Sequence, residues 1–450
     1  MREESFSYKK FLMLMIGLVI AILIDISVFK IYDLTDKYLI PIQSKIILFS
    51  VNSSLCLLLQ YFIIKYVRTA FKRGTNPLSE AFKVRAFYVI SLISLSALAV
   101  FIGFLIFQQI YYNYHDTFIS IFIIAISYGT AVTFIIWLSM LFLSWYKSNH
   151  SLIVFLYFMS MLVIAFNLIM TAVYSGAKVN DLPDRIREFV GASGDFYSGR
   201  HILLDYIYRV SSFMSFFSIW ITTAILMNYY REKLIYALAY WIMLTVPLVY
   251  FFISYFYQFF LGNLLTSYAQ IDPVTSSIVL GAFLSLSKPI GGLIFGAAFW
   301  NISRIISYER NIKTYMIISG WGLFLIFGTN QATTQIVPAF PAFGLATLTV
   351  LNIAAYLMLL GVYNSARLVS ANNELRRSIH KHALESKLLG LIGHAEMENE
   401  IQKAVKQVTK DKYDLEKELK EPVELDEKEL EKYIEFVVRE VKKEQQDQGS

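Results

Sequence analysis

Cysteine and charge are both scarce in this chain of 450 residues. The single cysteine, Cys56, excludes an intrachain disulfide bond and a metal cluster held by several thiolates. Only 16% of the residues are charged and 56% are hydrophobic, whereas soluble domains are about 25% charged. The composition therefore indicates a protein embedded in a lipid bilayer, and we expect no metal and no cofactor.

The few charges are distributed unevenly along the sequence. Nearly half of them fall in residues 371–450, whereas residues 1–370 are mostly apolar with an excess of Lys and Arg. We expect one boundary here, between a transmembrane helical domain (1–370) and a charged cytoplasmic helical tail (371–450). The pI near 9.0 reflects basic loops beside a membrane and not nucleic-acid binding, because the chain has no basic soluble stretch interleaved with aromatic residues.

Long apolar runs dominate residues 1–370. A helix needs about 20 mostly apolar residues to cross the hydrocarbon core, and a transmembrane barrel would instead show alternating segments of about ten residues. The sequence therefore predicts an all-α, polytopic transmembrane helix bundle. Ten segments qualify as spans: 11–29, 44–64, 86–110, 118–145, 151–174, 205–229, 234–259, 275–300, 314–329 and 343–365.

Basic residues predict the orientation of these spans. If the N-terminus is cytoplasmic, the inside segments hold most of the Lys and Arg, and three of the five outside loops hold none. Short loops rich in Lys and Arg stay in the cytoplasm. We therefore expect a multi-pass protein of the cell membrane whose two termini are both cytoplasmic.

Charged residues inside the predicted spans are candidates for a functional site. Lys288 lies midway along the eighth span, where a lysine costs about 2.5–3.5 kcal/mol to insert. It must face the bundle interior, with a partner or with water, or else lose its proton. Asp25 in the first span is the carboxylate nearest in depth, so an Asp25–Lys288 pair is the first hypothesis. Arg209 lies one turn inside the sixth span, where it can pair with Asp205 four residues earlier.

The sequence around Lys288, SLSKPIGGLIFG (285–296), predicts a break in the helix. Pro289 removes a backbone donor, Gly291 loosens the next turn, and a G-x-x-x-G pair that begins at Gly292 lets another helix approach closely. Such breaks form polar sites in many carriers, and the alternative is a kink that packs against a neighbour. The candidate ligand or ion site comprises Lys288, Asp25, Ser285, Ser287, Pro289, Gly291 and Gly292.

Two external segments also hold candidate residues. GTNQATTQIVPAFPAFG (328–344) joins the ninth and tenth spans without any charge, and we interpret it as an outer loop, either re-entrant or a simple surface turn. Residues 175–204 contain an amphipathic pattern that indicates either a short helix on the membrane surface or a solvated connector. The outer-loop candidates for hydrogen bonding to a small neutral ligand are Asn330, Gln331, Thr334 and Gln335.

The tail has no proline between Pro341 and Pro422. The tenth span can therefore continue into the cytoplasm as one straight helix, which over residues 366–408 would extend about 65 Å at 1.5 Å per residue. Apolar stripes on this helix, and on a second helix that begins at Asp426, need a partner. We expect them to pack on each other, on a second subunit or on a cytoplasmic protein.

Catalytic motifs are scarce. The spans hold no H-E-x-x-H motif, no paired carboxylates and no histidine cluster. We interpret His380, His382 and His394 of the tail as surface residues, because the sequence after His380 lacks the pattern of a phosphoacceptor and no glycine-rich nucleotide-binding segment follows. The sequence therefore favours a protein that is not an enzyme.

Residues 364–401, NSARLVSANNELRRSIHKHALESKLLGLIGHAEMENEI, directly follow the last predicted span. This stretch resembles that of a group of uncharacterised archaeal membrane proteins from ammonia-oxidising lineages, and the similarity extends to PAFPAFG just before the tenth span. The resemblance implies an archaeal host. It implies no activity and no catalytic residue.

Two functions follow from these features. The charged tail favours a membrane sensor or signalling scaffold, in which the tenth span passes a movement of the bundle to a cytoplasmic partner. Lys288 and the break in the eighth span favour the alternative, a small-solute transporter or channel with a site at the membrane midplane. A minimal carrier has no role for the long tail, so the sequence favours the sensor.

Overall fold

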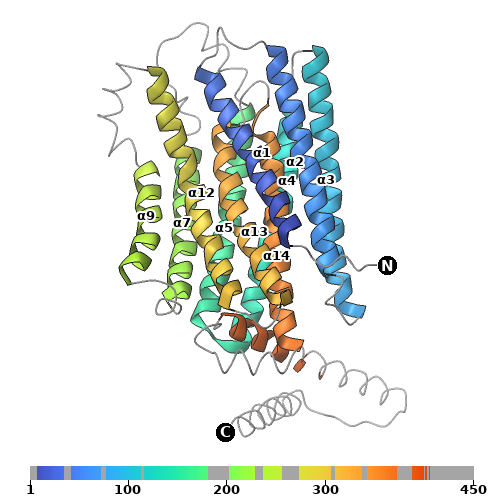
Figure 1. Ribbon diagram of the computed structural model, residues 1–450, viewed down its shortest axis with the longest axis vertical. Coiled ribbons are helices and arrows are strands. Elements are labelled where there is room, and N and C mark those ends of the chain that lie inside the picture. The colour runs from blue at the N-terminus through green and yellow to red at the C-terminus, as the bar shows by residue number, and fades with distance from the viewer. Residues whose placement is uncertain are drawn as a thin grey trace.

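The computed structural model describes most of the chain, and every regular element in the described residues is an α-helix (Figure 1). The described residues are 8–34, 42–71, 78–112, 116–180, 202–228, 237–255, 273–305, 310–336, 342–371, 388–399, 401–402 and 405. Ten of these helices form an elongated bundle, and residues 388–399 form a further helix at one end of it. The bundle helices are α1 (Tyr8–Leu34), α2 (Ile42–Phe71), α3 (Leu78–Tyr112), α4 (Thr117–Asn149), α5 (Leu152–Asn180), α7 (Ile202–Asn228), α9 (Ala237–Tyr255), α12 (Pro273–Ile305), α13 (Arg310–Ile336) and α14 (Leu345–Ala371).

The all-α prediction is confirmed, and each predicted span coincides with one bundle helix. Within the described residues, seven helices are long and apolar enough to cross a membrane: α2, α3, α4, α5, α7, α13 and α14. The protein is therefore an integral, multi-pass membrane protein in contact with the lipid bilayer. The helices α1, α9 and α12 occupy the other three predicted spans.

Local signals fix the sharp turn between α4 and α5. The side chain of Asp116 accepts a hydrogen bond of 2.9 Å from the backbone N–H of Phe118, which caps the N-terminus of α4. At the other end, His150 is left-handed with φ of 44°, and its N–H donates to the Tyr146 carbonyl at 2.7 Å. Because α5 begins at Leu152, the two helices pack along each other as a hairpin.

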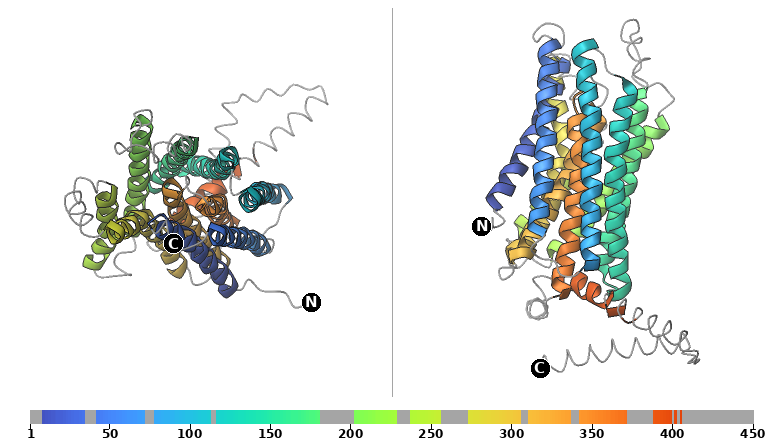
Figure 2. Two further views of the ribbon diagram at one scale, coloured as in Figure 1. Left: turned by 90° about the horizontal axis from the view of Figure 1, so that it is seen from above. Right: turned by 90° about the vertical axis from the view of Figure 1, so that its right-hand side faces the viewer.

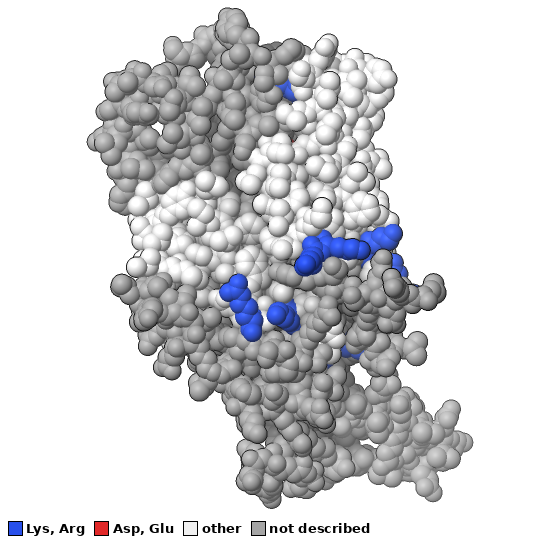
Figure 3. Space-filling model, in the orientation of Figure 1, with Lys and Arg blue, Asp and Glu red and all other residues white. Residues whose placement is uncertain are grey.

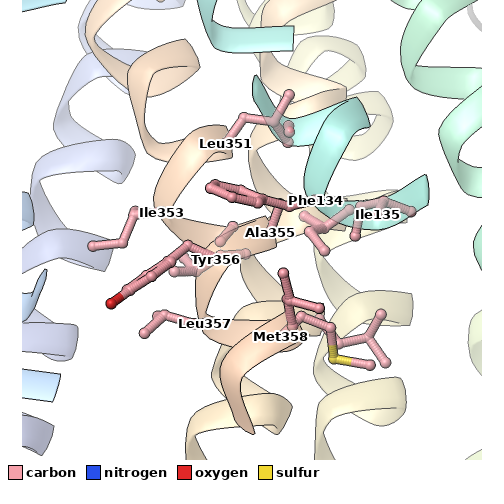
Figure 4. Packing of buried hydrophobic residues seen from close by; sticks show 14 of the residues in the cluster. Phe134, Ile135, Leu351, Ile353, Ala355, Tyr356, Leu357 and Met358 are labelled. Carbon is pink, nitrogen blue, oxygen red and sulfur yellow. The ribbon is translucent and has the colours of Figure 1, made fainter. Parts of the chain in front are cut away.

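The helix α14 lies at the centre of the bundle, with the other helices around it (Figure 2). The most apolar stretch of α14 is 100% buried, whereas that of the peripheral helix α3 is only 33% buried. Leu351, Tyr356 and Met358 of α14 share a continuous apolar core with Phe134 and Ile135 of α4 (Figure 4). This stretch of α14 therefore contacts protein on every side.

Small residues bring α12, α13 and α14 close together. A Cβ atom on Gly296 of α12 would lie 2.6 Å from the Gly320 carbonyl oxygen on α13, and one on Gly292 would lie 2.8 Å from the Phe327 side chain of the same helix. The predicted close approach at this glycine pair is thereby confirmed. On the other side of α13, a Cβ atom on Gly322 would lie 2.5 Å from the backbone nitrogen of Met358 on α14.

Two local predictions about helix interruptions are wrong. The helix α12 is continuous from Pro273 to Ile305 with Pro289 in its interior, so this proline does not break it. A proline removes one backbone hydrogen bond, and neighbouring helices allow a membrane helix to tolerate that loss. The helix α13 continues to Ile336, so residues 328–336 of the predicted outer loop are helical, because backbone groups at membrane depth must be hydrogen-bonded internally.

The tenth span does not continue as a straight rod. In a straight helix, Gly393 would lie about 36 Å beyond Val369 at 1.5 Å per residue. Instead, a Cβ atom on Gly393 would overlap the side chain of Val369 near the end of α14. The helix 388–399 therefore folds back onto the end of the bundle, and the apolar face that needed a partner is buried there.

Polar contacts hold the helix 388–399 on the end of α4. Trp145 Nε1 donates to Glu396 Oε2 at 2.6 Å, and both residues are buried. Ser148 Oγ donates to Asn399 Oδ1 at 2.9 Å, which adds a second contact between the same two helices. Other predictions concern residues outside the described ranges, namely the part of the amphipathic segment 175–204 that spans residues 181–201, His380, His382 and the helix from Asp426.

Basic side chains gather at one end of the bundle. On the face shown in Figure 3, the described Lys and Arg lie mostly towards the lower end, where the helix 388–399 also lies, and no described Asp or Glu is visible on this face. This is the end that the sequence assigns to the cytoplasm. The exposed basic residues near this end of their helices include Lys9, Lys10, Lys65, Arg85, Lys147, Arg304 and Lys313.

Candidate functional site

Lys288 is fully buried inside the bundle, as the cost of placing it in lipid requires. Its Nζ atom lies 5.5 Å from the ring centroid of Tyr208, which forms a cation–π contact between α12 and α7. Tyr208 is about 9 Å along α7 from Ile202, its first residue. The Lys288 ammonium group therefore contacts the predicted outer half of α7, although Lys288 is midway along the longer helix α12.

Tyr208 belongs to a stack of aromatic rings and basic side chains. Its ring is parallel to that of Tyr174 on α5, with 4.7 Å between the ring centroids. Lys178 Nζ lies 4.4 Å from the centroid of the Tyr174 ring. Each tyrosine ring thus contacts one ammonium group, and the negative face of an aromatic ring stabilises such a charge.

One carboxylate joins this stack. Asp205 accepts hydrogen bonds of 2.7 Å from the Tyr174 hydroxyl and from Arg209 Nε, which confirms the predicted Asp205–Arg209 pair. The group holds three basic residues and one acidic residue, so an anion complements its net charge. We call these six residues the cation–tyrosine cluster: Tyr174, Lys178, Asp205, Tyr208, Arg209 and Lys288.

A chain of hydrogen bonds leads from the cluster into the bundle. Ser211 Oγ donates to the Tyr208 carbonyl at 2.9 Å and accepts from Asn167 Nδ2 at 3.1 Å. Asn330 Nδ2 donates to Asn167 Oδ1 at 2.9 Å, and the Tyr128 hydroxyl donates to Asn330 Oδ1 at 3.1 Å. All four side chains are buried. This polar chain of Tyr128, Asn330, Asn167 and Ser211 joins α4, α13, α5 and α7.

Asn330 of the polar chain does not lie where the sequence predicted it. The sequence places this residue in an external loop, but it lies inside α13 and is buried between α4 and α5. The prediction is wrong because a polar run lowers the local hydropathy even where its side chains bond to neighbouring helices. The other outer-loop candidates Gln331, Thr334 and Gln335 lie in the same helix, and their side chains are outside the described part of the structure.

Asp25 has a different set of partners. Its Oδ2 atom accepts hydrogen bonds from the N–H groups of Gly344 and Thr347, both at 3.0 Å, and from the Thr347 hydroxyl at 2.7 Å. These groups form the N-terminus of α14, where unpaired N–H groups and the helix dipole favour a carboxylate. Gly344 has φ of 87°, a conformation that favours glycine. No described contact joins Asp25 to Lys288, so the structure does not bring the hypothesised pair together.

The other candidate residues near Lys288 contribute to helix packing. A Cβ atom on Gly291 would overlap the ring of Phe216 on α7, and Phe216 stacks on Phe251 of α9 with 3.9 Å between ring centroids. The surroundings of Pro289 thus fit the alternative of a helix that packs against its neighbours. Ser287 is buried beside Lys288, and the side chain of Ser285 lies outside the described part of the structure.

Sequence reasoning missed most of the cluster and the polar chain. Asn167 is the residue whose role the sequence could have indicated. It is an amide within the apolar run AFNLIM, and amide side chains in membrane helices tend to form hydrogen bonds with neighbouring helices. Tyr128, Tyr174 and Tyr208 carried none, because tyrosine is common at membrane interfaces. Protein-family models, curated proteins and solved structures were compared with this chain, and none of them matches it.

Proposed function

We propose that this protein is a membrane transporter for a small anionic solute that binds at the cation–tyrosine cluster. The position of Lys288 carries the proposal, because this residue is fully buried and lies in a cluster with two more basic than acidic residues. Ionisable residues within membrane bundles are costly and commonly mark solute or ion pathways. The excess of positive charge selects an anion as the solute.

The polar chain supports transport over simple binding. Asn167 lies two turns from Tyr174 on α5, which places it about 10 Å further from the predicted outer surface. Asn330 and Tyr128 continue the chain across the bundle. A solute that leaves the cluster would therefore meet further hydrogen-bonding groups deeper in the protein, as a carrier requires.

Uptake by the reconstituted full-length protein tests this proposal. Proteoliposomes would be incubated in parallel with radiolabelled carboxylates, inorganic phosphate, sulfate and a neutral amino acid in the external solution. We expect saturable uptake of at least one anion, and we expect Lys288→Met to abolish it. Lys313→Met is the matched control, because Lys313 is an exposed lysine at the opposite end of the bundle. Equal uptake by both variants would contradict the proposal.

We also propose that all ten bundle helices cross the membrane and that both termini are cytoplasmic. The basic side chains near the lower end of the bundle support this orientation (Figure 3). Single cysteines placed at Arg185 and at Ser450 in a Cys56→Ser background would be labelled with an impermeant maleimide. We expect the two positions to be labelled from opposite sides of the membrane, and labelling from the same side would contradict the orientation.

A sensor or signalling scaffold is the second candidate function. It is favoured by the helix 388–399, which contacts both α4 and α14 and can therefore respond to a relative movement of the two. In this proposal the signal passes through a docked helix and reaches a cytoplasmic partner bound by the charged tail (371–450). The resemblance to archaeal membrane proteins supports an archaeal host for this protein, and it does not indicate any activity.

A further inference from the structure

A second buried polar region lies on the other side of α14. It contains five oxygen atoms that have no hydrogen-bond partner within the described part of the chain. All five residues are fully buried, with exposed fractions of 0%. Buried polar atoms in proteins are nearly always paired, and an unpaired group calls for an explanation such as a bound ion or water. We call this set the oxygen seam: Asp25 Oδ1, Ser53 Oγ, Gln60 Oε1, Ser91 Oγ and Asn352 Oδ1.

Contacts with α14 bring the residues of the seam together. Asp25 binds Thr347, Gln60 Nε2 donates to Thr349 Oγ1 at 2.7 Å, and Asn352 Nδ2 donates to the Ser91 carbonyl at 3.4 Å. Thr347, Thr349 and Asn352 lie within about 8 Å of each other along α14. Side chains or backbone of α1, α2 and α3 therefore each contact the beginning of α14, within residues 344–352.

The position of Ser53 follows from the helical repeat of α2. Ser53, Cys56 and Gln60 are spaced three and four residues apart, so they share one face of the helix. Gln60 on this face reaches α14, and Cys56 lies close enough to interact electrostatically with Asp25. Ser53 is therefore on the face of α2 that is directed at Asp25 and the start of α14. The neighbouring Asn52 donates to the Ala21 carbonyl at 3.2 Å, one turn before Asp25.

The chemistry of the seam suits one monovalent cation. Its ligands are oxygens from one carboxylate, two amides and two hydroxyls, which are hard ligands. One positive charge balances one carboxylate, and among the described residues no group of three or more His, Cys, Asp or Glu is arranged to hold a metal ion. We infer that the oxygen seam binds a single monovalent cation, either sodium or a proton, at Asp25, with Ser53 as a further ligand. This inference concerns a site separate from the cation–tyrosine cluster and holds whether or not that cluster binds an anion.

A pair of serine variants tests the cation site. Ser53→Ala removes one oxygen of the seam, and Ser212→Ala removes a buried hydroxyl on α7 that likewise has no partner among the described residues. If Ser53 has only a structural role, the two variants behave alike, because removal of an unpaired buried hydroxyl is neutral or stabilising. If Ser53 is a ligand, only Ser53→Ala weakens cation binding.

The measurement is thermal unfolding of the purified full-length protein, titrated with sodium chloride against choline chloride at constant ionic strength and at several pH values. A sodium site predicts a saturable rise in melting temperature, with a midpoint about ten-fold higher in Ser53→Ala and unchanged in Ser212→Ala. A proton site predicts no sodium effect, but a pH-dependent melting temperature whose profile shifts in Ser53→Ala alone. Asp25→Asn should remove either response if it folds. Identical sodium and pH profiles for both serine variants would overturn the inference.

Discussion

The two buried polar regions of this bundle differ in charge and in how completely their atoms are paired. The cation–tyrosine cluster and the polar chain join α4, α5, α7, α12 and α13, and the residues that build them contact one another in a continuous series. The oxygen seam belongs to α1, α2, α3 and α14 and includes one carboxylate, and its five oxygens have no hydrogen-bond partner among the described residues. In the first region each named side chain contacts another member of the cluster or of the polar chain, whereas in the second an explanation for the five oxygens, such as a bound ion or water, is needed.

The largest expected effect concerns the carboxylate of the seam. Asp25→Ala leaves the N–H groups of Gly344 and Thr347 and the Thr347 hydroxyl without their acceptor inside the bundle. We expect the free energy of unfolding to fall by about 3–5 kcal/mol, since each unsatisfied buried group is costly. Titration with SDS from mild detergent measures this quantity. Asp205→Ala, at the partly exposed carboxylate of the cluster, should cost less, and an equal cost would remove the contrast between the regions.

The boundary between the two regions is the contact of α13 with α14. Gly322→Ala places a Cβ atom 2.5 Å from Met358 N and 2.8 Å from the Ala354 carbonyl oxygen, so the two backbones must separate. We expect a loss of about 1–3 kcal/mol in the free energy of unfolding. Gly103→Ala is the control, because nothing lies within 4 Å of its Cβ position. If Gly322→Ala left the free energy of unfolding unchanged, the contact of α13 with α14 would not hold the two regions together.

The polar chain should contribute less to stability than the Asp25 contacts. Asn167→Ala leaves Asn330 and Ser211 without one partner each. Hydrogen bonds between membrane helices contribute about 0.6 kcal/mol on average and up to about 1.7, so we expect a loss of about 1–2 kcal/mol. Ser96→Ala removes an exposed hydroxyl that bonds only to its own helix, and should be neutral in the same SDS titration. If Asn167→Ala lowered the free energy of unfolding by more than Asp25→Ala does, the polar chain would contribute more to stability than the Asp25 contacts, which would contradict this prediction.

The smallest effect is expected where the helix 388–399 meets α4. Trp145→Phe removes the donor to Glu396 and should cost about 1 kcal/mol, mostly in local stability. Hydrogen exchange of residues 388–399 should accelerate about five-fold for such a loss. Trp137→Phe, an exposed tryptophan on the same helix, is the control. Unchanged exchange in Trp145→Phe would argue against the docked helix as a route for a signal.

Helix positions and local pairs could be predicted from the sequence, whereas long-range partners could not. The apolar runs predicted all ten helices, because a membrane span needs a fixed length of apolar sequence. The Asp205–Arg209 pair was predictable because residues four apart meet on one helix. Asp25 and Lys288 were matched by depth alone, and depth does not show which helices are neighbours. For the same reason the sequence could not reveal that Asn330 is buried between two helices or that the helix 388–399 folds back.

The most direct test of the proposed anion site is a structure of the full-length protein in lipid nanodiscs with the anion that the uptake assay identifies. We expect density for the anion at the cation–tyrosine cluster, within hydrogen-bonding distance of Lys288 Nζ. Density for the anion at another place in the bundle, with Lys288 still against the ring of Tyr208, would contradict it.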